Sequence, residues 1–252
     1  MNRQKQFRIN AENWNEARQR YLNQGWRARI FCDLIISDIS SMPTSGRPTL
    51  LDIGCGKGFD CDLTLSEEMA KSAGRIIGIE PDPNVRLAPY FTETHQCIFE
   101  QAPLPSSSVD LAWAVMVLEH LERPELFWDK LSQVLKPGGI FWGITVDARH
   151  WFVWGSQMME SLRVKDAYLN VVRGTRGVDR YENYPVYYRS NTLKALRYLT
   201  RNFSQCDVIN FIKVGQINHY LPKSLAWFGN CVDQTLISFN GPGSLLAVRV
   251  VR

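Results

Sequence analysis

The spacing of hydrophobic positions changes near residue 48. Before that point, apolar side chains over 11–40 recur at intervals of three and four residues, which is typical of amphipathic helices. A segment rich in Ser, Pro and Gly at 40–48 then predicts a loop. From 49 to 146, short apolar runs alternate with amphipathic segments. This alternation predicts parallel strands joined by right-handed helical crossovers.

Seven apolar runs carry the strand signal, and most segments between them carry a helical one. The expected strands are 49–54, 75–80, 96–100, 109–117, 140–146, 206–214 and 244–251. The expected helices that follow the loop are 59–72, 83–91, 124–135, one near 156–171, and 190–202 with Ser190 as its N-cap. The sequence thus predicts an α/β protein whose seven-stranded, mostly parallel sheet has helices on both faces.

Composition narrows the class of protein. Of the 252 residues, 45% are hydrophobic and 21% are charged, which is ordinary for a globular chain with a full core. No apolar run approaches the roughly 18 residues that cross a bilayer, and the first residues lack a secretory signal, so we expect a cytoplasmic protein with no membrane span. The six cysteines form no C-x-x-C pair and do not cluster with the histidines. We therefore expect no metal site and read them as reduced, mostly buried residues.

Charge is unevenly distributed along the chain. The net charge is +4, but residues 1–148 carry −4 and residues 149–252 carry +8. A basic C-terminal part favours an anionic partner, such as a phosphorylated or carboxylated small molecule. A solvated basic face is an equally plain interpretation. No dense Lys/Arg patch or added RNA-binding module is present, which argues against nucleic acid as the partner.

A glycine-rich turn follows the first expected strand. The run Asp52-Ile53-Gly54-Cys55-Gly56-Lys57-Gly58 lets the backbone approach a ligand closely at the carboxyl edge of the sheet. A dinucleotide site requires a third glycine where this chain has Phe59. Asp52 would also repel a pyrophosphate and attract a cationic ligand. The turn therefore disfavours an NAD-dependent oxidoreductase.

Glu80 ends the second expected strand, and Pro81 follows it. An acidic side chain at this place can accept hydrogen bonds from both hydroxyls of a ribose. By itself Glu80 does not distinguish one nucleoside cofactor from another.

The order LLDIGCGKG, GIEPD, EQAPLPSSSVDLAWAVMVLEHL and VLKPGG over 48–146 closely resembles the class I S-adenosylmethionine-dependent methyltransferases, which have a Rossmann-like fold. The resemblance implies that the glycine turn holds the amino-acid part of the cofactor, that Glu80 holds the ribose, and that Glu100 and the Gln101 backbone lie at the adenine. It also implies that residues 115–120 form the floor of the methyl-transfer site. The implied cofactor residues are Asp52, Gly54, Cys55, Gly56, Gly58, Glu80, Pro81, Glu100, Gln101 and Val115.

We divide the single expected domain into an N-terminal helical lid (1–47), a cofactor-binding core (48–146), an acceptor-binding insertion (147–190) and a closing helix with strands (191–252). The aromatic insertion is similar to that of family members that methylate sugars or other small molecules. The residues that we expect to hold the acceptor are Trp151, Tyr187, Tyr188 and Arg189. Alternatively, these aromatics only cover the sheet. The N-terminal aromatics, likewise, either close a lid or form the buried face of two helices.

Methyl transfer to a hydroxyl calls for a base as well as alignment. The candidates are His150, with Asp147 nearby, and His120, although a single histidine is more often structural. The resemblance implies S-adenosylmethionine as cofactor, S-adenosylhomocysteine as product, and O-methylation of a small molecule such as a sugar, glycoconjugate or secondary metabolite. The alternatives are an RNA or protein methyltransferase and a non-catalytic cofactor-binding scaffold. Formation of a homo-oligomer is left open.

Overall fold

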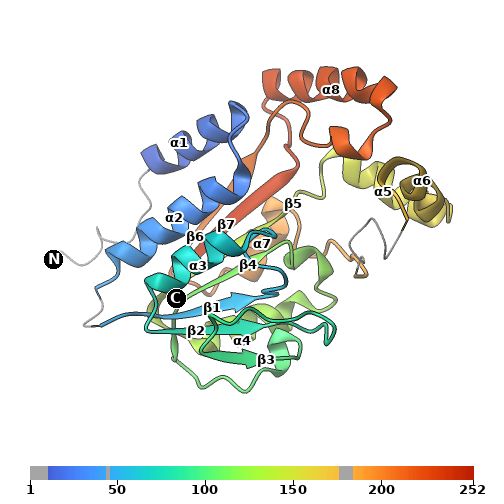
Figure 1. The fold of residues 1–252 in the computed structure, drawn as a ribbon. Coiled ribbons are helices and arrows are strands. Elements are labelled where there is room, and N and C mark those ends of the chain that lie inside the picture. The colour runs from blue at the N-terminus through green and yellow to red at the C-terminus, as the bar shows by residue number, and fades with distance from the viewer. Residues whose placement is uncertain (1–10, 44–45, 176–183) are drawn as a thin grey trace.

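A seven-stranded sheet forms the centre of the computed structural model, which describes residues 11–43, 46–175 and 184–252 (Figure 1). The strand order is β3-β2-β1-β4-β5-β7-β6. The strands are β1 (Thr49–Ile53), β2 (Arg75–Ile79), β3 (Glu93–His95), β4 (Val109–Val115), β5 (Leu135–Val146), β6 (Gln205–Phe211) and β7 (Leu245–Val251). Only β7 runs antiparallel to its neighbours, β5 and β6. This confirms the predicted seven-stranded, mostly parallel sheet.

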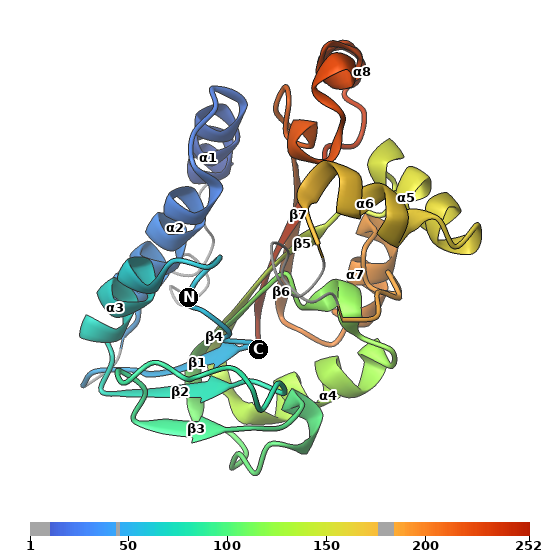
Figure 2. The same cartoon turned by 45° about the vertical axis from the view of Figure 1, so that its right-hand side comes forward.

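Helices cover both faces of the sheet and its carboxyl edge (Figure 2). One face is covered by α1 (Ala11–Leu22), α2 (Arg27–Ser41) and α3 (Leu63–Lys71), and the other by α4 (Pro124–Val134) and α7 (Leu193–Leu199). Beyond the carboxyl ends of the parallel strands lie α5 (Trp151–Ser161), α6 (Lys165–Arg173) and α8 (Ala226–Ser238). Four short 3₁₀ helices are η1 (Phe99–Gln101), η2 (Leu118–His120), η3 (Asn218–Tyr220) and η4 (Lys223–Leu225). No helix in these ranges is long and apolar enough to span a membrane.

The pleat of the strands creates two separate cores. Leu50 points into the core beneath α1–α3, whereas Leu51 points into the one beneath α4 and α7. The adjacent pair Trp113 and Ala112 divides in the same way. Because both faces are covered, these strands are largely apolar, with Asp52 in β1 and Asp110 in β4 as the acidic exceptions.

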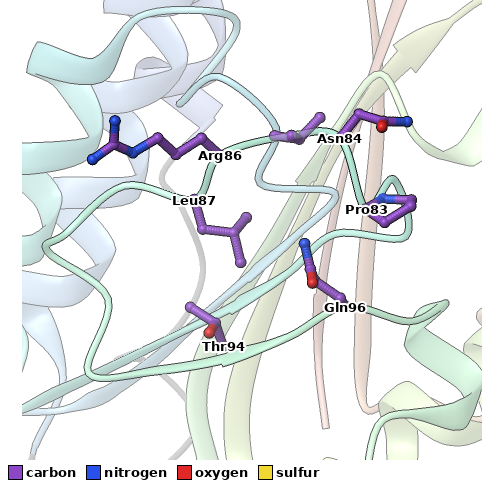
Figure 3. A pocket seen from close by; sticks show the side chains of 7 residues that line it. Pro83, Asn84, Arg86, Leu87, Thr94 and Gln96 are labelled. Carbon is purple, nitrogen blue, oxygen red and sulfur yellow. The ribbon is translucent and has the colours of Figure 1, made fainter.

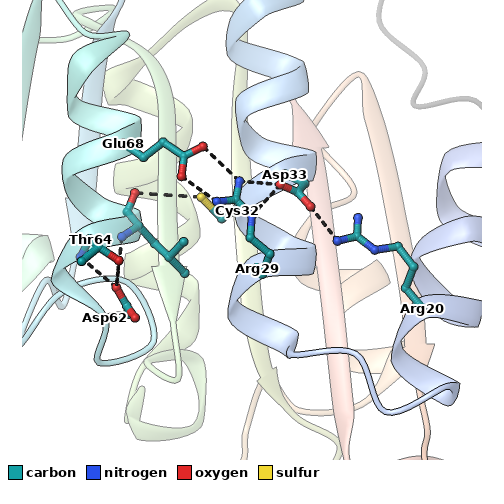
Figure 4. A network of polar contacts seen from close by, with 8 residues as sticks. Arg20, Arg29, Cys32, Asp33, Asp62, Thr64 and Glu68 are labelled. Carbon is teal, nitrogen blue, oxygen red and sulfur yellow. Dashed lines mark hydrogen bonds and ion pairs between the residues drawn. The ribbon is translucent and has the colours of Figure 1, made fainter.

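The N-terminal helices belong to the first core. Trp14 and Tyr21 are buried, and their rings contact Phe211 of β6. An ion-pair network crosses this layer: Asp33 of α2 pairs with Arg20 of α1 and with Arg29, which also pairs with Glu68 of α3 (Figure 4). Of the two interpretations of the N-terminal aromatics, the buried face of two helices holds for Trp14 and Tyr21.

Two elements predicted in the first half of the chain are wrong. Residues 83–91 form turns rather than a helix, because Pro89 disfavours helical backbone before it and Asp82 accepts a hydrogen bond from the Asn84 amide in a local turn. The third strand is 93–95 rather than 96–100, and part of the expected strand is the 3₁₀ turn η1. The helix predicted from residue 59 begins at Leu63, where the Asp62 carboxylate caps it.

Other element boundaries shift in the second half. The run 136–139 does not precede the fifth strand but forms a bulge within it, where Asp110 faces four residues of β5. The helix expected near 156–171 is two helices, which meet where Arg163 adopts a left-handed conformation (φ 58°). Thr192, not Ser190, caps α7. Helix α8 was not predicted. Strand β6 ends at Phe211, three residues before the predicted end at 214.

The six cysteines all have free thiols, but only Cys32 and Cys55 are buried. The expectation that most are buried is therefore wrong: Cys61, Cys206 and Cys231 are exposed.

Candidate functional site

A cavity of about 1070 Å³ lies at the carboxyl edge of the parallel strands. Of the ten residues predicted to bind the cofactor, nine line it. Cys55 does not; it is buried behind the turn. The nine are Asp52, Gly54, Gly56, Gly58, Glu80, Pro81, Glu100, Gln101 and Val115.

The three glycines of the turn all have positive φ values of 71°, 42° and 100°. A side chain at Gly54 would have its Cβ 2.5 Å from a methyl group of Val117, and one at Gly58 would meet the Asp62 carbonyl at 2.8 Å. At Gly56 the nearest atom would be an oxygen of Glu80 at 3.7 Å, so this position opens onto the cavity. The turn therefore exposes backbone to a ligand at Gly56 and packs closely at the other two.

Glu80 is buried and held by the main chain. One carboxylate oxygen accepts a hydrogen bond from the Gly56 amide at 2.9 Å, and the other accepts one from the Asp82 amide at 3.0 Å. These two bonds fix the carboxylate at the cavity wall. An acid fixed in this way is suited to accept hydrogen bonds from a diol.

Asp52 is a buried acid with an unsatisfied oxygen. Its Oδ2 atom has no hydrogen-bond partner. The pKa of Asp52 is raised to about 8, chiefly by burial; the Trp113 side chain lowers it in part, and the nearby Glu80 charge raises it. A cationic ligand in the cavity would stabilise the carboxylate.

These features fit the proposed cofactor at the level of donors and acceptors. S-adenosylmethionine brings an ammonium and a sulfonium, for which Asp52 provides an unsatisfied acid, and a ribose diol, for which Glu80 provides a fixed one. Glu100 and Gln101 of η1 line the same end of the cavity. Among the described residues, no three His, Cys, Asp or Glu side chains are arranged to hold a metal ion.

The segment after β4, residues 116–120, lies between the cofactor end of the cavity and the segment 184–188. The Glu119 carbonyl accepts hydrogen bonds from the amides of Tyr187 and Tyr188, at 2.8 and 3.2 Å. His120 Nδ1 lies 2.8 Å from the Pro185 carbonyl, which can only accept, so that nitrogen carries the proton. The neighbouring Nε2 is then the basic nitrogen of the neutral ring.

Glu119 also has a buried side chain at the cavity wall. The Thr145 hydroxyl donates to its carboxylate at 2.7 Å and in turn accepts from the Asn191 amide at 2.6 Å. Burial raises the pKa of Glu119, whereas the neighbouring His120 and the Thr145 hydrogen bond lower it in part. The sequence singled out 115–120 as the floor of the site but not this side chain.

The far end of the cavity is aromatic. Three of the four expected acceptor residues, Trp151, Tyr187 and Tyr188, line it. Burial raises the pKa of Tyr188 to about 12, so its hydroxyl stays protonated. The fourth, Arg189, does not line the cavity: it donates to the Glu122 carbonyl, and its guanidinium lies over the Tyr187 ring.

The two other predicted catalytic residues lie behind the cavity wall. His150 is fully buried and caps α5, with Nε2 3.8 Å from Asp233. Asp147 is fully buried as well and pairs with Arg149. Neither residue lines the cavity, so this placement does not favour His150 as the base.

Several cavity residues escaped the sequence analysis. Arg27 of α2 lines the cavity and makes two hydrogen bonds to Asp60, at 2.6 and 2.5 Å. Their contact joins positions 33 residues apart, for which the sequence holds no signal. Other aromatic or apolar wall residues missed include Phe152, Met159, Tyr168, Leu169, Tyr220 and Leu221.

A second hollow, of about 500 Å³, lies beside the edge strand β3 (Figure 3). It is lined by the loop before β3, including Asn84 and Arg86, and by Thr94 and Gln96. It shares no lining residue with the main cavity.

Comparison with known proteins finds a family match for the segment that contains most of β1 together with β2 and β4. Residues 51–143 match the family model described as a methyltransferase domain. A ubiquinone biosynthesis O-methyltransferase from Methylobacterium sp. is 33% identical over 107 residues, which are 39% of this chain and 41% of that protein. A probable S-adenosylmethionine-dependent methyltransferase from Mycolicibacterium smegmatis is 33% identical over 96 residues, or 36% and 35% of the two chains. The matches thus span about two fifths of the length of these relatives.

Solved structures extend the likeness to the fold. A SAM dependent methyltransferase from Archaeoglobus fulgidus superposes with a TM-score of 0.55 at 12% identity, covering 93% of this chain and 97% of that one. Phosphoethanolamine N-methyltransferase 2 from Haemonchus contortus, solved with S-adenosyl-L-methionine, gives 0.53 at 15% identity over 90% of this chain and 53% of that one. At these identities the comparison establishes the shared fold.

Proposed function

Residues 51–143 of this chain form a class I S-adenosylmethionine-dependent methyltransferase domain, and from this we propose that the protein methylates a hydroxyl group of a small molecule. The acceptor class that we propose is a sugar, a glycoconjugate or a secondary metabolite, with a flat or apolar face that the aromatic wall can cover. The O-methyltransferases among the relatives support transfer to oxygen.

One observation carries this proposal: the acid-lined and the aromatic ends belong to the same cavity, and His120 lies on its wall. A donor held at Asp52 and Glu80 and an acceptor held at Trp151 and Tyr188 would therefore share one cavity. Close alignment of the reacting groups is the main requirement of methyl transfer and can supply about 7–11 kcal/mol in favourable cases.

When bound, S-adenosylmethionine would supply a methyl group that its positive sulfur activates for transfer to the acceptor oxygen, with S-adenosylhomocysteine as the leaving group. His120 Nε2, whose ring is oriented by the Pro185 carbonyl, takes the hydroxyl proton. Asp52 and Glu80 hold the donor, and the tyrosines of 187–188, fixed by their amides to Glu119, position the acceptor.

Calorimetric titration with S-adenosylhomocysteine tests the cofactor part of the proposal. We expect micromolar binding to the wild type and a loss of about 10- to 100-fold in Glu80→Ala, because a charge-assisted hydrogen-bond pair is removed. Glu125→Ala is the control, because Glu125 is an exposed acid on α4 that does not line the cavity. A folded wild type that does not bind would overturn the proposal. Binding without turnover on any hydroxylated acceptor would indicate a scaffold instead.

A further inference from the structure

Helix α5 carries an apolar stripe on its outer surface. Trp151, Trp154, Met158 and Leu162 follow one another at intervals of three and four residues, so they lie along one side of the helix. The last three are 69%, 61% and 62% exposed. Large apolar side chains seldom gather on an open surface unless that surface binds something.

The stripe continues onto α8. The ring of Phe228 meets that of Trp151 with centroids 6.4 Å apart, and Trp227 packs edge-on against Phe228. Trp227 is 65% exposed and Phe228 is also exposed. Both ribbon views place α5, α6 and α8 together at one end of the molecule (Figures 1 and 2). We call Trp151, Trp154, Met158, Leu162, Trp227 and Phe228 the α5/α8 surface.

The same helix separates this surface from the acceptor end of the cavity. Phe152, Ser156 and Met159 line the cavity from the inner side of α5. Trp151 is only partly exposed; it lines the cavity, and its ring also contacts Phe228 at the start of the stripe. The stripe and the cavity therefore adjoin at this residue.

Positive charge flanks the α5/α8 surface. Arg163, Arg173 and Lys223 are exposed on or beside α5, α6 and α8, and so are the acids Glu160, which pairs with Lys165, and Asp166. The basic side chains of these helices and their flanks outnumber the exposed acids, which favours a negatively charged partner surface.

We propose that the α5/α8 surface docks onto an anionic lipid membrane, with its aromatic side chains in the headgroup region and its basic residues against the lipid phosphates. Tryptophan and phenylalanine beside Lys and Arg are typical of segments that lie in the membrane interface without crossing it. A second copy of the chain fits less well, because a two-fold interface would bring this basic surface against itself.

Vesicle flotation tests the proposal without requiring activity. We expect the wild type to float with phosphatidylglycerol vesicles, to float little with phosphatidylcholine vesicles, and to be released by raised salt. The double variant W154S/W227S should bind at least about tenfold more weakly, because two interfacial side chains are lost. Trp26→Ser is the matched control: Trp26 is 52% exposed but lies at the start of α2, and its variant should float like the wild type.

Three results would overturn the proposal. The first is a wild type that does not bind anionic vesicles, and the second is a double variant that binds them as the wild type does. The third is a wild type that is a dimer in solution and becomes a monomer in the W154S/W227S variant. Titration with S-adenosylhomocysteine on the same samples keeps the proposals apart, because a double variant that binds this ligand normally retains an intact cofactor site.

Discussion

At the scale of single residues, ionisation of Asp52 is unfavourable in the folded protein, and a cationic ligand would make it more favourable. Its carboxyl is buried with one oxygen unsatisfied, and its pKa is raised to about 8, chiefly by burial. The unfolded chain ionises this group near pH 4, whereas the folded chain keeps it protonated until about pH 8. Folding therefore becomes less favourable as pH rises through this window.

We predict that Asp52→Asn flattens the pH dependence of stability between about pH 4 and 8. In the wild type, this group lowers the free energy of unfolding as pH rises, and the amide cannot ionise. Urea denaturation at several pH values measures the difference. The same variant should bind S-adenosylhomocysteine more weakly at pH 8, because the ligand's ammonium loses its carboxylate. Parallel pH profiles of stability for the two proteins would show that Asp52 is already ionised in the folded state.

His120 is the residue on which the proposed proton transfer depends. We predict that His120→Gln lowers kcat by about 10²- to 10⁴-fold, the usual contribution of a general base, and leaves the affinity for S-adenosylhomocysteine unchanged. His219→Gln is the control, because His219 lies outside the cavity lining and its pKa is lowered to about 4, mainly by burial. A loss of kcat confined to His150→Gln would move the role of base to that residue.

At the scale of elements, one ion pair joins the N-terminal helices to the cofactor end. Arg27 of α2 grips Asp60, which has a left-handed conformation (φ 52°) two residues beyond Gly58. The buried face of α2 packs on the sheet, and among the described residues of α1, α2 and α3 it is Arg27 that lines the cavity. It is the feature that best supports the expected lid role of 1–47, which stays a prediction.

We predict that Arg27→Met weakens S-adenosylhomocysteine binding by about fivefold, equivalent to about 1 kcal/mol, because the loop after the glycine turn loses its anchor. Methionine keeps much of the apolar stem. Arg20→Met should not change the affinity, because Arg20 pairs with Asp33 away from the cavity. Equal affinities of the Arg27→Met variant and the wild type would leave the ion pair a purely structural role.

Elements that depend on a local sequence pattern could be predicted from the sequence. Elements that depend on contacts between distant segments could not. The turn at 52–58 and Glu80 follow directly from a strand and its next residues. The split between α5 and α6 depends on the backbone of Arg163, and nothing in the hydrophobic spacing signals it. The pairing of Glu119 with the 187–188 amides joins segments about 70 residues apart, which hydrophobic periodicity does not reveal.

At the scale of the whole molecule, a buried polar cluster links the N-terminal layer to the last strand. Asp38 of α2 accepts hydrogen bonds from the Trp142 indole of β5 at 2.8 Å and from Arg249 of β7 at 2.7 and 3.0 Å. Arg249 is almost fully buried. The cluster specifies how helix and sheet meet, because Asp38 accepts from both Trp142 and Arg249 in this packing.

We predict that Arg249→Met lowers the free energy of unfolding by about 3–5 kcal/mol, since it leaves the Asp38 charge buried and unpaired. The double variant Asp38→Leu/Arg249→Met should recover much of this loss. Urea midpoints of the three proteins measure both effects. A single variant as stable as the wild type would mean that water or a rearranged neighbour satisfies Asp38.

The position of β7 has a consequence for synthesis on the ribosome. Strands β5 and β6 do not pair with each other; β7 lies between them and comes after both in the chain. While the chain is being made, β5 therefore presents an open edge, a hazard for mispairing, for about 100 residues of elongation. The β1–β5 part of the sheet can pair early, whereas β6 can join it only when the last strand has been made.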